Sequence, residues 1–308
     1  MIAIQADGLS RSSVRWYSAM LKPLGDHFRD LQLADVTTAL LRRYVVGLRT
    51  RDSRYEGSAS SRPEAAGGLS DESVSAHIRA LHRFWNWATI EYRLQSNPML
   101  NIKRPSRRSP QPKGIDLADL RALFAATGDD IAGCRDRAIM AFLIDTGCRA
   151  QGLTGLELAR LDMSQRRAVV IEKGKRTRTV FFTDRTAALL EQWAAVRPSV
   201  ATTVFCSLGP RVYGKPLSYE GLTFILDHLK TKAGVAGRVN PHSFRHAFAR
   251  QYIMNGGDLA TLSQLMGHSD STVTSWYYAV FTDGELSNMH DRFSPAKGVL
   301  DEDKDSND

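Results

Sequence analysis

The chain has 308 residues, of which 43% are hydrophobic and 24% charged, and its 41 lysines and arginines against 33 acids give a formal net charge of +8. This length and composition predict a globular protein of two domains rather than one. No segment approaches the roughly 20 apolar residues of a membrane span, and the N-terminus lacks the charged-then-apolar pattern of a signal peptide. These features exclude a membrane-spanning protein and predict a cytoplasmic one.

Basic and acidic residues are unevenly distributed along the chain. Residues 301–308 contain five acids and one lysine, so the rest of the chain carries a charge of +12. A basic body favours a polyanionic partner, and nucleic acid is the first candidate. The end of the chain, 296–308, has the composition of an acidic, disordered tail.

The three cysteines, Cys134, Cys148 and Cys206, are widely spaced and form no Cys-x-x-Cys pair. This pattern indicates neither a disulfide framework nor a zinc knuckle. We expect all three to be small core residues in a reducing compartment.

The first hundred residues predict helices. Apolar side chains recur at helical spacing over 14–24 and again over 36–48. The segment 54–68 is rich in Ser, Gly and charge, which predicts a loop. After it, Ser70 is placed to cap a third helix that continues to Asn97.

Residues 103–113 contain five basic residues, three prolines and no acid. Prolines keep such a segment extended, which predicts a linker between two domains. Its charges either follow a phosphate backbone or belong to a solvated spacer without contacts. The candidate DNA contacts of the linker are Lys103, Arg104, Arg107 and Arg108.

The remainder of the chain predicts a mainly helical domain with a small sheet. Two β-rich runs, 168–171 and 179–182, flank a basic segment and predict a hairpin with a basic tip. Three side chains of this hairpin are candidate DNA contacts or ordinary solvated charges, namely Lys175, Arg176 and Arg178. Helical patterns surround the hairpin at 117–124, 138–144, 187–196, 219–233 and 243–255.

A segment near the C-terminus concentrates residue types that act on phosphate. An arginine fork matches two phosphate oxygens, an imidazole donates to a third or moves a proton, and a phenol oxygen attacks phosphorus. Each residue alone is most often a packing or surface residue, but their combination indicates phosphate chemistry. The members of this cluster are His242, Arg245, His246, His268, Tyr277 and Tyr278.

Two basic residues far upstream make this cluster more specific. Arg149 ends a Thr-Gly-Cys-Arg motif, and Lys173 lies in a Glu-Lys-Gly turn of the predicted hairpin. Together with the cluster they resemble the tyrosine recombinases, or phage-integrase-like site-specific recombinases. In that family an arginine after Thr-Gly-x, a hairpin lysine, His-x-x-Arg-His, Leu-Gly-His and a tyrosine follow in this order. Here Tyr277 lies nine residues beyond His268, which makes it the candidate nucleophile rather than Tyr278.

The resemblance covers nearly the whole chain and implies its fold class. We expect a mainly α protein of two domains, with an N-terminal helical core-binding domain at 1–102 that binds DNA. After the linker at 103–113, we expect an α+β catalytic domain at 114–295 with a small antiparallel sheet.

The residue types predict how the chemistry is divided. Arg149 and Arg245 supply charged donors to the non-bridging phosphate oxygens, and His242 accepts the phenolic proton. His268 donates to a phosphate oxygen, and the resemblance implies that Lys173 protonates the leaving 5′ oxygen. The predicted catalytic residues are therefore Arg149, Lys173, His242, Arg245, His268 and Tyr277.

The predicted reaction needs no cofactor. Exchange of a phosphodiester for a 3′-phosphotyrosyl bond conserves bond energy, so the chemistry requires neither ATP nor a metal. The resemblance implies double-stranded DNA with a specific recombination site as partner and a homo-oligomer on DNA, typically a tetrameric synapse. We also expect a cytoplasmic, nucleoid-associated protein that belongs to a mobile element. Integration, excision and resolution all stay open as its natural task.

Two positions depart from the family pattern. The family has an acid three residues after the first arginine, where this chain has Gly152, and Asp eleven residues after it, where this chain has Arg160. Whatever supports Arg149 must therefore differ.

Three alternatives stay open at this point. A type IB topoisomerase would use the same chemistry without paired sites, and a non-catalytic DNA-binding member of the fold would bind without cleaving. A metal-dependent nuclease would use His242, His246 and His268, although Ser243 stands where the zinc-peptidase pattern needs Glu.

Overall fold

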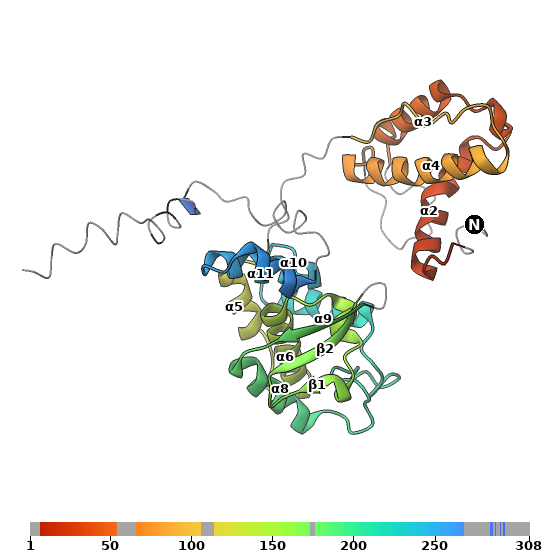
Figure 1. Cartoon of the computed structure of the whole chain (residues 1–308). Helices are drawn as coiled ribbons and strands as arrows, with labels where there is room; N and C mark the ends of the chain where they lie inside the picture. Colours follow the sequence, from red (N-terminus) through yellow and green to blue (C-terminus); the bar gives the residue numbers. More distant parts are fainter. Residues whose placement is uncertain are drawn as a thin grey trace, which may run out of the picture. The chain divides into compact units, whose positions relative to one another are not determined.

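The computed structural model describes residues 7–53, 66–105, 114–172 and 176–267, together with five positions between 284 and 292 (Figure 1). The chain divides into two compact units, Met1–Pro110 and Gln111–Asp308. The described part is mostly helical with one small antiparallel sheet, so the predicted fold class is confirmed. No helix in the described ranges is long and apolar enough to cross a membrane.

The N-terminal unit is helical throughout its regular elements. It contains α2 (Arg11–His27), a short 3-10 helix (Leu33–Asp35), α3 (Thr38–Thr50) and α4 (Asp71–Glu91). Helix α4 packs against both α2 and α3, and its Trp85 is fully buried between them and their neighbours. Trp85 is therefore part of the hydrophobic core of this unit.

The predicted start of α4 is confirmed, but its predicted end is wrong. The hydroxyl of Ser70 accepts a hydrogen bond from the backbone N–H of Ser73, as a helix cap does. The helix ends at Glu91, six residues before Asn97, because Arg93 adopts a left-handed φ of 49° that no helix can continue through.

The C-terminal unit carries the sheet. Strand β1 (Leu161–Asp162) pairs with β2 (Arg167–Glu172), which pairs with β3 (Arg176–Phe181), all antiparallel in the order β1-β2-β3. The predicted hairpin is therefore confirmed, while the two-residue β1 was not predicted. The helices of this unit are α5 (Leu117–Ala125), α6 (Ile131–Thr146), α7 (Ala150–Thr154), α8 (Asp184–Val196), α9 (Tyr219–Lys232), α10 (Pro241–Met254) and α11 (Leu259–Met266).

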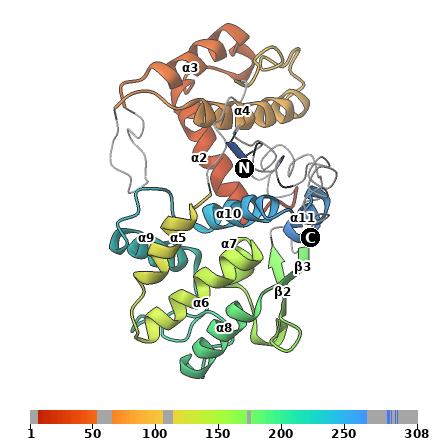
Figure 2. The same ribbon diagram turned by 90° about the vertical axis from the view of Figure 1, so that its left-hand side faces the viewer.

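Helix α6 is the central element of this unit (Figure 2). It packs against α8, α10 and strand β3, which come from separate parts of the chain. The core around it includes Phe142, Phe205 and Phe244, together with Cys148 and Cys206, and Cys134 packs partly buried against it. The expectation that the cysteines are core residues is confirmed for the two that are fully buried.

Helix α10 begins at Pro241, two residues earlier than predicted. Asn240 caps it, because its side-chain oxygen accepts from the Ser243 N–H at 3.0 Å while the Ser243 hydroxyl accepts from the Asn240 N–H at 2.9 Å. Proline fits the first helical position, where its missing N–H leaves no bond unmade. This cap places His242 in the first turn and Arg245 in the second.

Candidate active site

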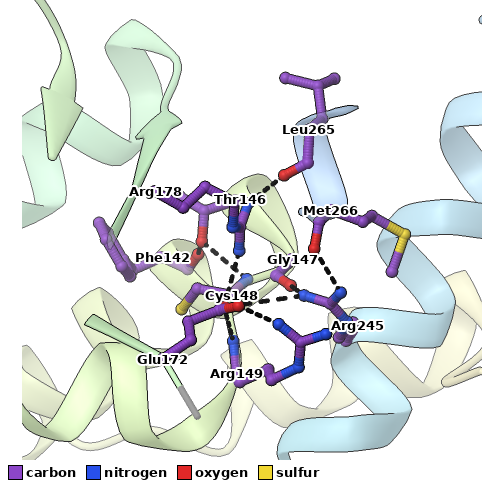
Figure 3. Close-up of polar contacts among 10 residues, drawn as sticks. All are labelled: Phe142, Thr146, Gly147, Cys148, Arg149, Glu172, Arg178, Arg245, Leu265 and Met266. Carbon is purple, nitrogen blue, oxygen red and sulfur yellow. Dashed lines mark hydrogen bonds and ion pairs between the residues drawn. The ribbon is translucent and has the colours of Figure 1, made fainter. Parts of the chain in front are cut away.

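The turn between α6 and α7 explains why Thr and Gly precede Arg149. Gly147 ends α6 in the left-handed conformation, with φ 56°, and a Cβ there would collide with the ring of Phe248. The Thr146 hydroxyl accepts from the Cys148 N–H at 3.2 Å and donates to the Phe142 carbonyl at 2.6 Å. Arg149 then directly precedes α7, and its guanidinium lies beside the carboxylate of Glu172 (Figure 3).

Arg245 reaches this turn from α10. Its Nη1 donates to the Gly147 carbonyl at 2.6 Å, and its Nη2 donates to the Met266 carbonyl at 2.7 Å. The side chain is 6% exposed, so the guanidinium is held almost entirely inside the protein. Arg245 thus joins the end of α6 to the last carbonyls of α11.

Glu172, the last residue of β2, lies at the centre of the arginines (Figure 3). Its Oε1 accepts from the Arg149 backbone N–H at 3.2 Å and from Arg178 Nη2 at 2.9 Å, and it lies 4.0 Å from Arg245 Nη1. Its Oε2 forms an ion pair with Arg149 Nη1. One carboxylate therefore contacts three guanidiniums that come from three distant segments of the chain.

Charge keeps Glu172 ionised despite its burial. Burial opposes the charged form, but the Arg178 charge and hydrogen bond, followed by those of Arg149, outweigh it and hold the pKa of Glu172 below its ordinary value. Three guanidiniums with one carboxylate leave the cluster with net positive charge. Such a centre suits an anion with several oxygens, as a phosphate is.

Arg178 has a different place from the one predicted. We expected a DNA contact or a solvated charge, but its side chain is only 10% exposed and points inward. It bonds Glu172 and the Leu265 carbonyl, and its Cδ would lie 2.7 Å from a Cβ at Gly267, where φ is 63°. Arg178 and Arg245 therefore hold the carbonyl end of α11, where positive charge is favourable.

The two histidines of α10 are both shifted toward the neutral form. Burial, followed by the charges of Arg245 and Arg149, lowers the pKa of His242, although its side chain keeps an exposed face. Burial, followed by the charges of His242 and Arg245, lowers the pKa of His246 to about 4. A neutral imidazole accepts a proton, which is the role that we predicted for His242.

Cys148 lies beside this cluster without sharing its chemistry. The side chain is fully buried, and burial raises the pKa of its thiol to about 11. A thiol that stays protonated at neutral pH is a poor nucleophile. We assign Cys148 to the core of the unit.

The structure brings together some of the predicted site residues and does not describe the others. Arg149 and Arg245 meet on Glu172, and His242 lies near enough to both for their charges to lower its pKa. Three predicted catalytic residues lie outside the described residues, namely Lys173, His268 and Tyr277. Two of them directly follow described elements, since Lys173 comes after Glu172 and His268 after Gly267.

The candidate DNA contacts are likewise divided. Lys103, Arg104 and Arg176 are exposed. The others fall outside the described residues, namely Arg107, Arg108 and Lys175. Within the described ranges, no group of three or more His, Cys, Asp or Glu is placed to hold a metal ion, and His268 of the metal alternative is not among them.

Glu172 is the member of this cluster that the sequence analysis did not predict. Strand β2 alternates buried and exposed side chains, and Glu172 falls on the buried side with Ala168 and Val170. An acid at a buried position of a strand needs a positive partner. The sequence does not show which face Glu172 lies on, because the four residues before it form a continuous apolar run. Glu172 also answers the departure at Gly152, because the carboxylate that supports Arg149 comes from β2.

The fold and the site define a two-unit protein with a phosphate-binding type of centre. The unit that contains the sheet brings arginines from separate segments together into a centre of net positive charge. Residues 113–283 match the model of the phage integrase family. Tyrosine recombinase XerC of Yersinia pestis is 26% identical over 282 residues, which are 85% of this chain and 91% of the relative. XerC of Xylella fastidiosa (strain M23) is 29% identical over 211 residues, which are 68% of this chain and 70% of the relative.

Solved structures agree in fold. The Tn1549 transposon integrase in complex with transposon right end DNA has a TM-score of 0.72 at 16% identity, over 95% of this chain and 97% of that one. The XerH site-specific recombinase bound to palindromic difH substrate has a TM-score of 0.68 at 16% identity, over 92% and 80%.

The chain belongs to the phage integrase family, because the family model covers more than half of it. The predicted membership of the tyrosine recombinases, an enzyme family of site-specific DNA recombination, is thereby confirmed.

Proposed function

We propose that this protein cleaves and rejoins DNA strands at a specific site through a 3′-phosphotyrosyl bond to Tyr277. The observation that carries the proposal is the cluster in which Glu172 joins Arg149 to Arg245. Two always-charged, planar donors held at one place match the charge that builds on a phosphodiester under attack. The relatives named above are tyrosine recombinases, which supports the same chemistry here.

The proposed step balances without any other reactant. The Tyr277 oxygen attacks phosphorus, the bond to the DNA 5′ oxygen breaks, and Lys173 supplies the proton that this oxygen takes. His242 accepts the phenolic proton, which its lowered pKa favours because the imidazole is neutral at pH 7. Attack by a 5′-hydroxyl reverses the step, so neither ATP nor a metal is required.

His268 follows the end of α11, which Arg178 and Arg245 hold through the carbonyls of Leu265 and Met266. We propose that this anchoring lets His268 donate to a phosphate oxygen alongside the two arginines. An anchored donor costs no reorganisation when charge develops on that oxygen.

We further propose that both units bind the DNA duplex, with residues 1–102 as the core-binding domain and residues 114–295 as the catalytic domain. The linker at 103–113 would follow the phosphate backbone through Lys103, Arg104, Arg107 and Arg108, and the hairpin would contact it through Lys175 and Arg176. Exchange of strands between two sites needs several copies, so the working form is a homo-oligomer on DNA, a tetramer at full synapsis. The DNA in the Tn1549 integrase and XerH structures supports this partner.

A covalent-trapping assay tests the proposed function. The protein is incubated with a pool of nicked duplexes of randomised sequence, in which cleavage releases the leaving strand, and denaturant-resistant adducts are recovered and sequenced. We expect adducts enriched in one sequence, lost in Tyr277→Phe and retained in Tyr278→Phe.

The same assay separates the alternatives. Adducts without sequence enrichment, together with relaxation of any supercoiled plasmid, would support a type IB topoisomerase. Cleavage without adduct that stops on addition of chelator would support a metal-dependent nuclease, and binding without cleavage a non-catalytic member of the fold.

A further inference from the structure

We propose that Glu172 is the positioning residue that holds Arg149 for the phosphate, and that it does so because no side chain reaches Arg149 from position 152. This inference rests on the proposed function for its activity measurement and on the structure alone for its geometry. It adds to the reaction a residue that none of the predicted roles includes.

Glu172 fixes Arg149 at two separate points. Its Oε1 accepts from the Arg149 backbone N–H at 3.2 Å, and its Oε2 pairs with Arg149 Nη1. The first contact sets where the chain enters α7, and the second sets the direction of the guanidinium (Figure 3). A long, flexible side chain bound at its base and its tip has little rotamer freedom left to lose on binding an anion.

The burial of the arginines shows which of them is presented outward. The Arg149 side chain is 32% exposed, whereas Arg178 and Arg245 are 10% and 6% exposed. Glu172 is itself only 5% exposed, so the carboxylate contacts Arg149 from the protein side. The exposed part of Arg149 remains directed toward solvent, where a phosphate arrives.

Val170 crowds position 152 against a longer side chain. Helix α7 packs on β2, and a Cβ at Gly152 would lie 3.1 Å from Val170 Cβ and 3.4 Å from its Cγ2. Val170 thus fills the space over the α-carbon of Gly152. Two residues further along the same face of β2, Glu172 is the acid that reaches Arg149.

Removing the carboxylate would leave three guanidiniums close together without the anion that Glu172 places between them. Their mutual repulsion in a partly buried place favours outward rotation of Arg149, the most exposed of the three. Arg178, by contrast, keeps its bond to the Leu265 carbonyl. The expected defect is therefore a misplaced Arg149 in a folded protein.

Two measurements test the proposal, and the first needs no DNA. Guanidinium 15N–1H spectra, with Arg149 assigned from Arg149→Lys, should show hindered rotation of Arg149 in the wild type and free rotation in Glu172→Gln. Glu157→Gln is the matched control, since Glu157 pairs with Arg160 at 3.1 Å and is not part of the arginine cluster. Hindered rotation in both variants would overturn the proposal.

The second measurement is single-turnover adduct formation at saturating DNA. Glu172→Gln should lower the rate about 10- to 100-fold, by analogy with the loss of a partner that orients a metal ligand. DNA affinity should stay within about 3-fold of wild type, because many other phosphate contacts remain. Glu172→Asp keeps the charge and should recover part of the rate. This variant also provides the test if Glu172→Gln does not fold.

A double-mutant cycle shows whether Glu172 acts through Arg149. In an Arg149→Lys background, Glu172→Gln should cost at most about 3-fold, because the side chain that it positions is already gone. An equal loss in both backgrounds would assign Glu172 a general structural role and refute the proposal. If the wild type forms no adduct while the spectra show the Arg149 coupling, the proposed function fails and the positioning role stands.

Discussion

Arg245 Nη1 lies 2.6 Å from the carbonyl oxygen of Gly147, and this bond joins the second turn of α10 to the residue that ends α6. Through Nη2 the same guanidinium holds Met266 at the end of α11. The arginine of the His-x-x-Arg-His motif is therefore a structural joint as well as a proposed phosphate donor. Its two roles make different demands on stability and on rate.

Arg245→Lys should lower both the stability of the fold and the rate of adduct formation. One ammonium cannot span two carbonyls as a planar guanidinium does, so the free energy of unfolding should fall by about 2 kcal/mol. The rate of adduct formation should fall about 10²- to 10³-fold, by analogy with loss of an oxyanion donor. Arg149→Lys is the comparison. It should lower the rate by a similar factor but reduce the free energy of unfolding by less than Arg245→Lys does. Urea unfolding measures the stability, and single-turnover cleavage measures the rate. An Arg245→Lys protein as stable as the wild type would contradict the structural role of Arg245.

Gly147→Ala should destabilise the turn before Arg149 for two reasons. A non-glycine residue at φ 56° costs about 1 kcal/mol, and its Cβ would also collide with Phe248. Gly234→Ala is the matched control, because φ is 66° there and nothing lies within 4 Å of the added Cβ. Thermal unfolding should show a clearly larger loss at 147 than at 234, and equal losses would show that the contact with Phe248 is unimportant.

The lowered pKa of His242 gives a pH prediction for the reaction. A base must be unprotonated, so the cleavage rate at saturating DNA should be level near pH 7 and fall only below the ordinary histidine pKa of about 6.5. His242→Gln should lower the rate about 10²-fold or more and remove this decline. If the cleavage rate of His242→Gln still falls at acid pH with the same midpoint, the decline belongs to another group.

His246 makes a separate prediction for stability. The unfolded chain binds its proton near pH 6.5, but the folded protein binds it only near pH 4. Protons therefore favour unfolding in that window, and stability that is full above about pH 6.5 declines as the pH falls toward 4. The difference between 6.5 and about 4 corresponds to at most about 3.5 kcal/mol, since one pKa unit is about 1.4 kcal/mol, and solvent screening at this partly exposed side chain makes the true contribution smaller. His246→Gln should flatten this decline in urea unfolding, and parallel curves would contradict it.

Local patterns predicted the elements whose cause is local. The hydroxyl of Ser70 and the acids after it mark the start of α4, and runs of β-branched and aromatic residues mark β2 and β3. The end of α4 was missed because it depends on the left-handed backbone of Arg93, and arginine carries no signal for that conformation. Strand β1 was missed because two residues are too few to show a period.

The site divides in the same way. Motif order in the sequence identified Arg149, His242 and Arg245, and the structure brings the two arginines onto one carboxylate. Glu172 was missed because its partners lie 23, 6 and 73 positions away, and only the fold brings them together. The inward turn of Arg178 was missed for the same reason.

The central claim is that Tyr277 carries the DNA through a 3′-phosphotyrosyl bond. The most direct test is to digest the trapped adduct with nuclease and protease and to locate the nucleotide by tandem mass spectrometry. We expect a nucleotide joined through its 3′ phosphate to the Tyr277 oxygen. A nucleotide on Tyr278, on another side chain or joined through a 5′ phosphate would contradict it.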